Sequence, residues 1–211
     1  MRTRKEAASS ARSTFARFLQ RPLRAITKRL AVHENVQVGI GARIGRGVVI
    51  SAPHHLVIGN YVSVGPRSII QVDGKIGDFA IIGMGVQVVG RSDHAFDEVG
   101  VPVADATWVG DRAASPIDAV QIGRDVWLGG SCVVLSGISI GDAAIVGAGA
   151  VVVHDVPPGA IVAGNPAKFL RWRFDAPEML ASHLHAIAAR AHDASLPADT
   201  RRTNGHPEDD Q

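Results

Sequence analysis

An aliphatic residue recurs at every sixth position through most of this 211-residue chain, and a glycine often follows it. A small or β-branched residue stands four positions after most of these aliphatics. A period of six matches neither an amphipathic helix, with about 3.6 residues per turn, nor a free-standing strand, with about two. It is typical of a coil of short parallel strands with a corner every six residues. The aliphatic series is Val38, Ile44, Ile50, Ile58, Val64, Ile70, Ile76, Ile82, Val88, Ile122, Leu128, Val134, Ile140, Val146 and Val152.

The repeat also predicts which residues stack on one another. If three hexads make one turn, each aliphatic residue lies against the one three hexads later, one inter-strand spacing of about 4.8 Å away. The glycines at the second hexad position, such as Gly59 and Gly77, are expected to relieve strained backbone at the corners. The predicted stacked pairs are Ile58 with Ile76, Val64 with Ile82, and Ile70 with Val88.

The hexads are interrupted once by a long segment. They run over residues 34–90, stop over 91–119, and resume from Ile122 to about residue 163. The step from Ile50 to Ile58 is longer than the others, which predicts a bulge at residues 52–55. A long loop inside so regular a repeat is costly to order and is usually functional. We therefore expect the loop 91–119 to carry the chemistry.

The two ends differ from the repeat. Residues 1–33 form a basic amphipathic leader, with nine Lys and Arg against Glu6 over residues 1–30. It is expected to form a helix that caps the solenoid, or alternatively makes peripheral contact with an anionic membrane. Residues 164–193 are expected to form a C-terminal loop and helix. Residues 194–211 are polar and are expected to be disordered.

Composition excludes several classes of protein. No apolar run approaches the roughly 20 residues of a membrane span, and the amino terminus lacks the apolar core of a secretory signal. The excess of basic residues is confined to the leader, which argues against a nucleic-acid-binding groove in the repeat. The single cysteine, Cys132, cannot form an intrachain disulfide, which fits the cytoplasm. It occupies an inward position and is expected to be inert core.

The second half of the chain carries the most specific motifs. After a His-bearing loop come Ile122–Gly130 (IGRDVWLGG), Gly147–Val152 (GAGAVV), Asp155–Gly159 (DVPPG) and Ala163–Lys168 (AGNPAK). This ordered series resembles the hexapeptide-repeat acyltransferases, in the branch of maltose, galactoside and xenobiotic acetyltransferases and their polysaccharide O-acetyltransferase relatives. The resemblance implies an all-β solenoid, a left-handed parallel β-helix with N-terminal and C-terminal helical extensions. It also implies a homotrimer that binds acetyl-CoA between subunits.

The resemblance places the catalytic histidine at His94, where the first set of coils meets the loop. Acetyl transfer to a hydroxyl needs a base beside the acceptor oxygen, and histidine, with an ordinary pKa near 6.5, suits that role at neutral pH. Asp93 or Asp97 is a candidate to orient the imidazole, although a backbone carbonyl can do the same. His54 and His55, at the predicted bulge, are expected at the surface or within reach of an acceptor.

The resemblance further assigns coenzyme contacts to residues beyond the loop. Trp127 would line the acetyl and pantetheine channel, or else pack on the exterior of the solenoid. Gly130 and Ala148 match positions whose backbone lines the coenzyme cleft. Lys168 and Arg171 match basic residues that meet the coenzyme phosphates, although solvated positions are the alternative. No metal is expected.

These observations favour a cytoplasmic, acetyl-CoA-dependent O-acetyltransferase acting on a sugar or glycan precursor. An alternative is a xenobiotic or small-molecule acetyltransferase, since the segment Arg171–Phe174 resembles the tail of that branch. A non-catalytic solenoid for assembly or binding is a third interpretation. A β-helix carbonic anhydrase would need three histidines on zinc from neighbouring coils, and the repeat offers only His54, His55 and His154 besides His94.

Overall fold

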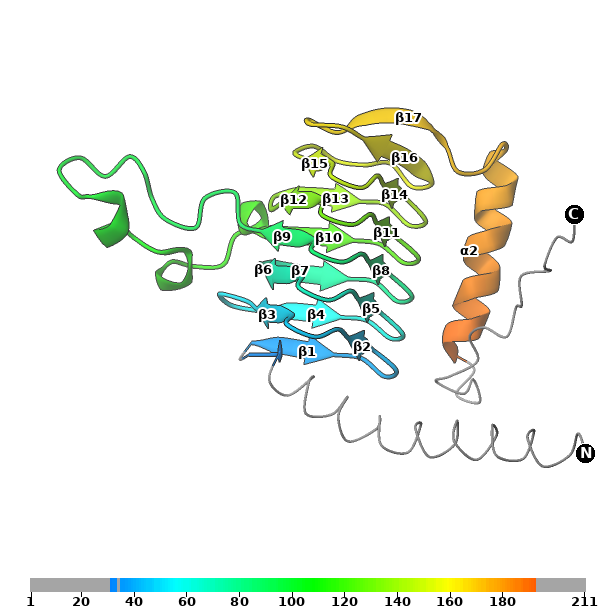
Figure 1. Cartoon of the computed structure of the whole chain (residues 1–211), viewed down its shortest axis with the longest axis horizontal. Helices are drawn as coiled ribbons and strands as arrows, with labels where there is room; N and C mark the ends of the chain where they lie inside the picture. The colour runs from blue at the N-terminus through cyan, green and yellow to red at the C-terminus, as the bar shows by residue number, and fades with distance from the viewer. Residues whose placement is uncertain (1–30, 34, 193–211) are drawn as a thin grey trace, which may run out of the picture.

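Short parallel strands stack into a three-sided prism in the computed structural model, which describes residues 31–33 and 35–192 (Figure 1). The first face contains β1 (Val36–Val38), β4 (Leu56–Ile58), β7 (Asp73–Ile76), β10 (Ala119–Ile122) and β13 (Ile138–Ile140). The second contains β2 (Arg43–Ile44), β5 (Ser63–Val64), β8 (Ile81–Ile82), β11 (Trp127–Leu128), β14 (Ile145–Val146), β16 (Ala160–Ala163) and β17 (Lys168–Trp172). The third contains β3 (Val49–Ser51), β6 (Ile69–Gln71), β9 (Gln87–Val89), β12 (Val133–Leu135) and β15 (Val151–Val152).

The predicted β-solenoid and its stacking are confirmed. Ile58 pairs with Ile76, Val64 with Ile82 and Ile70 with Val88, one pair on each face. Ile76 then pairs with Ile122 across the loop, so the stack continues although nearly thirty residues intervene between β9 and β10. The loop therefore leaves the prism at one corner without breaking it.

Two inward residues from each hexad fill the interior. From Ile50 onward every aliphatic residue of the series is buried, and so are most of the small or β-branched residues four positions after them, including Cys132. Burying one Val, Leu or Ile side chain stabilises a fold by about 1.5–3 kcal/mol. A narrow prism accepts these side chains and excludes aromatic rings, which explains why the core is almost entirely aliphatic.

The corner glycines serve a different purpose from the one predicted. Gly59 and Gly77 do not adopt a positive φ; a Cβ on Gly77 would instead lie 2.6 Å from the carbonyl carbon of Gly123 on the next turn. The left-handed backbone occurs elsewhere in the corners, for example at Tyr61 (φ 57°) and Arg67 (φ 59°). The prediction of strain at these glycines was wrong, because the close approach of stacked turns is what requires them.

Each corner of the prism carries different structure. The corner between the first and second faces supports helix α2 (Pro177–His192). Asp125 in this corner accepts hydrogen bonds from Arg173 Nη1 (2.7 Å) and His183 Nε2 (2.8 Å). The segment before α2 was expected to be a loop, but Lys168–Trp172 forms β17 and pairs antiparallel with β16. It ends the parallel stack by covering its last edge.

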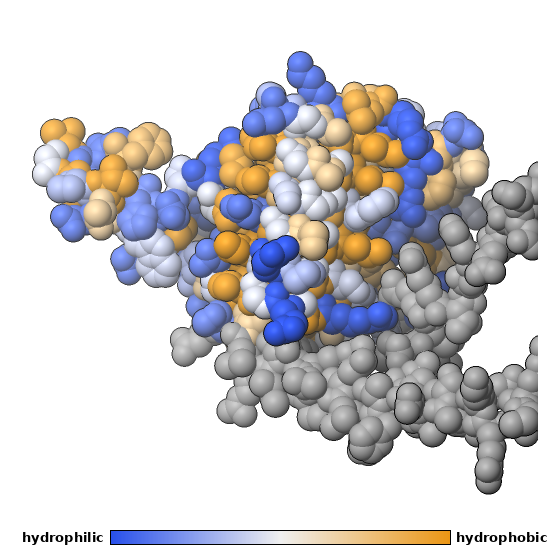
Figure 2. All heavy atoms as spheres, in the orientation of Figure 1, coloured by the Kyte–Doolittle hydropathy of each residue, from blue (hydrophilic) through white to orange (hydrophobic). Residues whose placement is uncertain are grey.

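The loop projects from the corner between the third and first faces (Figure 1). It contains three short 3-10 helices, η1 (Val103–Asp105), η2 (Val109–Asp111) and η3 (Pro116–Asp118). Figure 2 shows apolar surface on the projecting part of the loop. Phe96, Val99 and Val103 are 77%, 100% and 58% exposed there.

Two predicted segments lie outside the described residues. These are most of the basic leader (1–30), with its cap or membrane role, and the polar tail (194–211). Within the described range, the leader ends with Val32 bridged to Ile50 and Ala31 buried. None of the helices in that range has the length and apolar character needed to cross a bilayer.

Candidate active site

His94 is fixed by pairing between the two limbs of the loop. The outgoing limb, residues 90–95, and the returning limb, residues 107–112, meet in an antiparallel bridge between His94 and Trp108. Ala95 N donates to Thr107 O at 2.9 Å, and Val109 N donates to Asp93 O at 2.8 Å. These bonds set the backbone of His94, whose side chain remains about one third exposed. A base placed in this way can still be reached by substrate.

The two acidic candidates beside His94 differ in position. Asp93 Oδ1 lies 3.4 Å from His94 Nδ1, longer than an ordinary hydrogen bond, and the Asp93 side chain is 75% exposed. Asp97 is exposed on the loop. Asp93 is therefore the acidic candidate that the structure places beside the His94 ring.

A cavity of about 410 Å³ lies beneath the loop. Its floor comes from the solenoid corner, with Ala52, Pro53 and Val72, and its upper wall from Asp93 and Trp108 of the two paired limbs. His94 follows Asp93 and bridges Trp108, so the candidate base adjoins two residues that line this cavity. The volume is within the range of small-molecule sites.

Each limb of the loop is fastened to a different turn of the solenoid. On the outgoing limb, Arg91 N donates to the buried Ser136 Oγ (2.9 Å), and Arg91 Nη2 donates to Val153 O (2.9 Å). On the returning limb, the carbonyl of Arg112 meets His54 Nε2 at 2.7 Å. The guanidinium of Arg112 forms two bonds with Asp118, at 2.6 and 2.8 Å.

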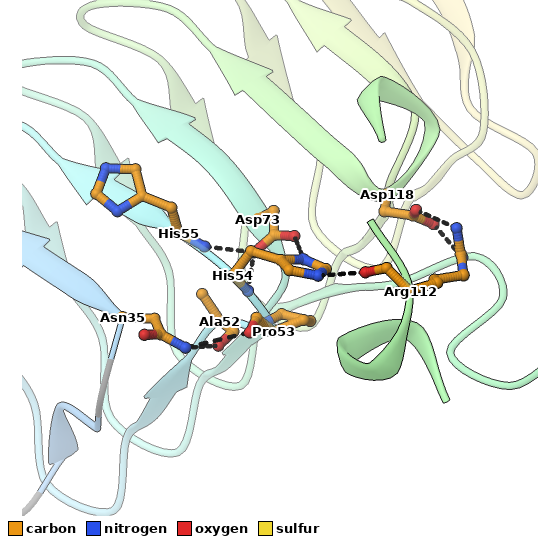
Figure 3. Close-up of polar contacts among 8 residues, drawn as sticks. All are labelled: Asn35, Ala52, Pro53, His54, His55, Asp73, Arg112 and Asp118. Atoms are coloured by element: carbon orange, nitrogen blue, oxygen red, sulfur yellow. Dashed lines mark hydrogen bonds and ion pairs between the residues drawn. The ribbon is translucent and has the colours of Figure 1, made fainter. Parts of the chain in front are cut away.

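Asp73 holds the other side of the His54 ring. Its Oδ2 lies 2.7 Å from His54 Nδ1, and its Oδ1 accepts the backbone N–H groups of His54 and His55, each at 2.8 Å. The hydrogen bond to Asp73 raises the pKa of His54, with a further contribution from the Arg112 carbonyl. Figure 3 shows the ring of His54 between these partners, with His55 turned away from them.

The sequence did not indicate this network. His55 is exposed, as one of the two interpretations expected, but His54 is engaged with Asp73 and Arg112. Two signals were present: the lengthened step at residues 52–55, and the acidic Asp73 inside an apolar hexad. Neither could identify Arg112, because it lies 58 residues from His54.

The expected coenzyme residues lie on a different part of the prism. Trp127 is half exposed on the second face, and Gly130 and Ala148 occupy successive turns of the corner between the second and third faces. Lys168 and Arg171 are exposed on β17, at the end of the second face. His94 leaves from the opposite edge of the third face. One chain therefore does not bring its own His94 and these residues together.

Two other candidate chemistries find little support. Cys132 is fully buried, and burial raises the pKa of its thiol to about 12, so it is unsuited to act as a nucleophile. Over the described part of the chain, no group of three or more His, Cys, Asp or Glu side chains is placed to hold a metal ion. The zinc carbonic anhydrase alternative therefore has no ligand cluster in that part.

Comparison with known proteins identifies the repeat. Residues 119–154 match the family model described as bacterial transferase hexapeptide (six repeats). A chloramphenicol acetyltransferase from Escherichia coli is 38% identical over 112 residues, which cover 49% of this chain and 53% of the relative. The repeat of this chain is therefore similar to that of the hexapeptide-repeat acetyltransferases. The matches span about half or less of the length of these curated relatives.

Solved structures of two acetyltransferases share the fold. One is an acetyltransferase from Vibrio cholerae O1 biovar eltor complexed with acetyl coenzyme A, with a TM-score of 0.53, 24% identity, and coverage of 72% of this chain and 76% of that chain. Another is the polySia-specific acetyltransferase NeuO, with a TM-score of 0.52, 22% identity, and coverage of 72% and 73%. At these identities the likeness establishes the solenoid alone.

Proposed function

We propose that this hexapeptide-repeat protein is an acetyl-CoA-dependent O-acetyltransferase with His94 as its general base. The observation that carries the proposal is the position of His94, on paired limbs at the edge of a 410 Å³ cavity. The family supplies the reaction class, because its curated members include acetyltransferases. A reducing cytoplasm, which the single cysteine favours, would suit a reaction that releases a thiol.

In the proposed reaction, neutral His94 accepts the proton of the acceptor hydroxyl as its oxygen attacks the thioester carbonyl carbon. A new C–O bond forms, and backbone N–H groups stabilise the resulting oxyanion. Collapse of this intermediate breaks the C–S bond and expels the coenzyme thiolate. The proton held by His94 then neutralises the thiolate, so the enzyme returns to its starting state with an acetyl ester and free coenzyme as products. Asp93 is the proposed partner of the imidazolium.

The proposed active site is shared between copies of the chain in a homotrimer. In support, the coenzyme residues Trp127, Gly130 and Ala148 lie away from the corner that carries His94. The apolar residues of the projecting loop, with Val99 fully exposed, need a partner surface. A neighbouring copy would cover them and bring its second face to His94. Lys168 and Arg171 would then bind the coenzyme phosphates.

We propose a small, xenobiotic-type hydroxyl compound as the acceptor. The similarity to chloramphenicol acetyltransferase favours this acceptor over the sugar that the sequence favoured. The cavity has the volume of a small-molecule site, and its lining combines apolar residues with Gln71, Ser92 and Asp93. A sugar hydroxyl is the second candidate, supported by the fold shared with NeuO.

A screen with labelled acetyl-CoA tests the function. Purified protein would be incubated with acetyl-CoA and a panel that contains chloramphenicol, other hydroxyl-bearing antibiotics, simple sugars and sialic acid oligomers. Label is expected in a small antibiotic-like acceptor, and transfer only to the sugars would select the second candidate. Calorimetric titration with coenzyme A accompanies the screen. No transfer together with no coenzyme binding would reject the enzyme and favour the non-catalytic solenoid.

A further inference from the structure

His54 is the point at which the solenoid holds the returning limb of the loop. Its ring lies between Asp73 Oδ2 and the carbonyl oxygen of Arg112, each 2.7 Å from a ring nitrogen (Figure 3). The bulge at residues 52–55 places the ring one turn below Asp73 and two turns below the loop. The side chain is only 24% exposed, so water reaches it partially.

The two partners of this ring favour one protonation state. A carbonyl oxygen accepts hydrogen bonds and never donates them, so Nε2 must carry a proton. The carboxylate of Asp73 accepts two backbone N–H groups through Oδ1, which leaves Oδ2 to accept from the His54 ring. Its Oδ2 therefore also requires a donor, and Nδ1 must be protonated as well. Both bonds are satisfied together only by an imidazolium.

The other charged groups around His54 favour the same state. Asp118, from η3, is buried and adds a favourable Coulomb interaction with the His54 ring. The guanidinium of Arg112 is directed to Asp118, with both carboxylate oxygens engaged. His55 is exposed and its ring is turned away (Figure 3). Asp73 and Asp118 thus offset the desolvation of a charged ring.

The two limbs of the loop differ in what holds them. The outgoing limb is held by Ser136, whose hydroxyl does not titrate in the accessible pH range. The returning limb is held by His54, whose ring does titrate in that range. Because the limbs are paired at Asp93, Ala95, Thr107 and Val109, a movement of the returning limb would be transmitted to His94.

We propose that His54 is a positioning residue: its doubly protonated ring fastens the returning limb to the solenoid and so keeps His94 in place at the cavity. This inference rests on the proposed function, because acetyl transfer is one of its readouts. A neutral ring can donate only one hydrogen bond, and the charge-assisted bond to Asp73 is the stronger, so loss of a proton breaks the bond to Arg112. The returning limb is then released and transfer slows.

The sign of the pH dependence follows from the raised pKa of His54. The contribution of the imidazolium is fully present below the ordinary histidine pKa and is lost as the pH rises through the raised value. Activity should therefore fall on the alkaline side, with His54 responsible for the fall.

Asp73→Asn is the decisive variant. An asparagine can keep both backbone bonds through Oδ1 and donate from Nδ2 to Nδ1 of a neutral ring, whose Nε2–H still reaches Arg112. The network is then complete without the charge. The alkaline fall in kcat/KM should disappear in Asp73→Asn while activity at neutral pH stays near wild type. If kcat/KM of Asp73→Asn fell at alkaline pH as it does in wild type, the proposal would be overturned.

Two further variants separate positioning from general damage. His54→Gln removes the titrating group, so its activity should be roughly tenfold lower at neutral pH, with no alkaline fall. Ser136→Ala removes the non-titrating hydroxyl that holds the outgoing limb of the loop. It should lower activity and leave the alkaline fall at the same pH as in wild type. A wild-type alkaline fall in His54→Gln would also overturn the proposal.

A measurement that needs no enzymatic activity accompanies these assays. The ¹⁵N shifts of the histidine ring nitrogens, with His54 assigned from His54→Gln, report whether both nitrogens are protonated. Both nitrogens should be protonated through neutral pH, and one should lose its proton over the same alkaline pH range in which activity falls. A neutral ring at the pH of greatest activity would overturn the proposal. An imidazolium at His54 in a protein that transfers no acetyl group would reject the proposed function and leave the fastening of the loop intact.

Discussion

At the scale of single residues, two histidines have opposite requirements. His94 must lose its proton to act as a base, whereas His54 must keep both of its ring protons to hold the loop. Their partners explain the difference. His94 has one exposed carboxylate 3.4 Å away, while His54 has a buried carboxylate and a carbonyl, both at 2.7 Å.

Replacing His94 by alanine should remove the base and leave the fold intact, because the side chain is partly exposed on the loop. We expect turnover to fall by about 10²- to 10⁴-fold, the usual contribution of general base catalysis. Coenzyme affinity, measured by calorimetry, should change little. His185→Ala, a change of the same type on the exposed face of α2, is the matched control. Wild-type turnover in His94→Ala would reject the assignment of the base.

Cys132 gives a second prediction at this scale. Its thiol is fully buried, and its pKa is raised to about 12, so almost no thiolate forms at neutral or mildly alkaline pH. Iodoacetamide should therefore leave the native protein unmodified, as followed by mass spectrometry, and should alkylate it rapidly in denaturant. Comparable rates in the two conditions would contradict a core position for this residue.

The sequence could predict that His94 lies at the start of the loop, but it could not predict the partners of His54. His94 stands where the hexads stop, and an interruption is visible along one chain. The His54 network joins residues 19 and 58 positions apart through a loop whose path no local pattern specifies. Asp73 is recognisable only as a departure from an apolar hexad.

At the scale of elements, the close stacking of successive turns restricts which residue types each position can hold. The period of six predicted the strands and their register because two inward side chains per hexad must fill a narrow core. It did not predict β17, whose five residues lack the hexad pattern and pair antiparallel. It also gave the wrong reason for the corner glycines, because a contact between successive turns cannot be seen in one hexad.

Gly77→Ala tests that contact. The added Cβ would lie 2.6 Å from the backbone of Gly123, so two turns of the solenoid must separate. We expect a loss of about 1–3 kcal/mol in the free energy of unfolding, the typical cost of overpacking. Gly90→Ala is the control, because its Cβ would meet nothing nearer than 3.9 Å. Chemical denaturation measures both, and equal stabilities of the two variants would contradict the steric explanation.

At the scale of the whole molecule, the residues of the proposed site lie on two separate parts of the prism. The loop with His94 leaves from one corner of the prism, while Trp127 and the basic pair Lys168 and Arg171 lie on the second face. The exposed apolar residues of the projecting loop, Phe96 and Val99 among them, give a reason for copies to associate. A site completed by a neighbouring copy would explain why His94 and the proposed coenzyme residues lie on different parts of the same chain.

Complementation between two inactive variants tests this sharing most directly. His94→Ala lacks the base, and the double variant Lys168→Glu, Arg171→Glu repels the coenzyme phosphates, so each alone should transfer acetyl groups poorly. Mixed oligomers, made by co-expression with two different tags, should recover activity because some sites pair an intact His94 with an intact coenzyme surface. Mixing His94→Ala with a chain that carries all three substitutions should recover none. Activity of the mixed oligomers no greater than the sum of the separate variants would contradict a site shared between subunits.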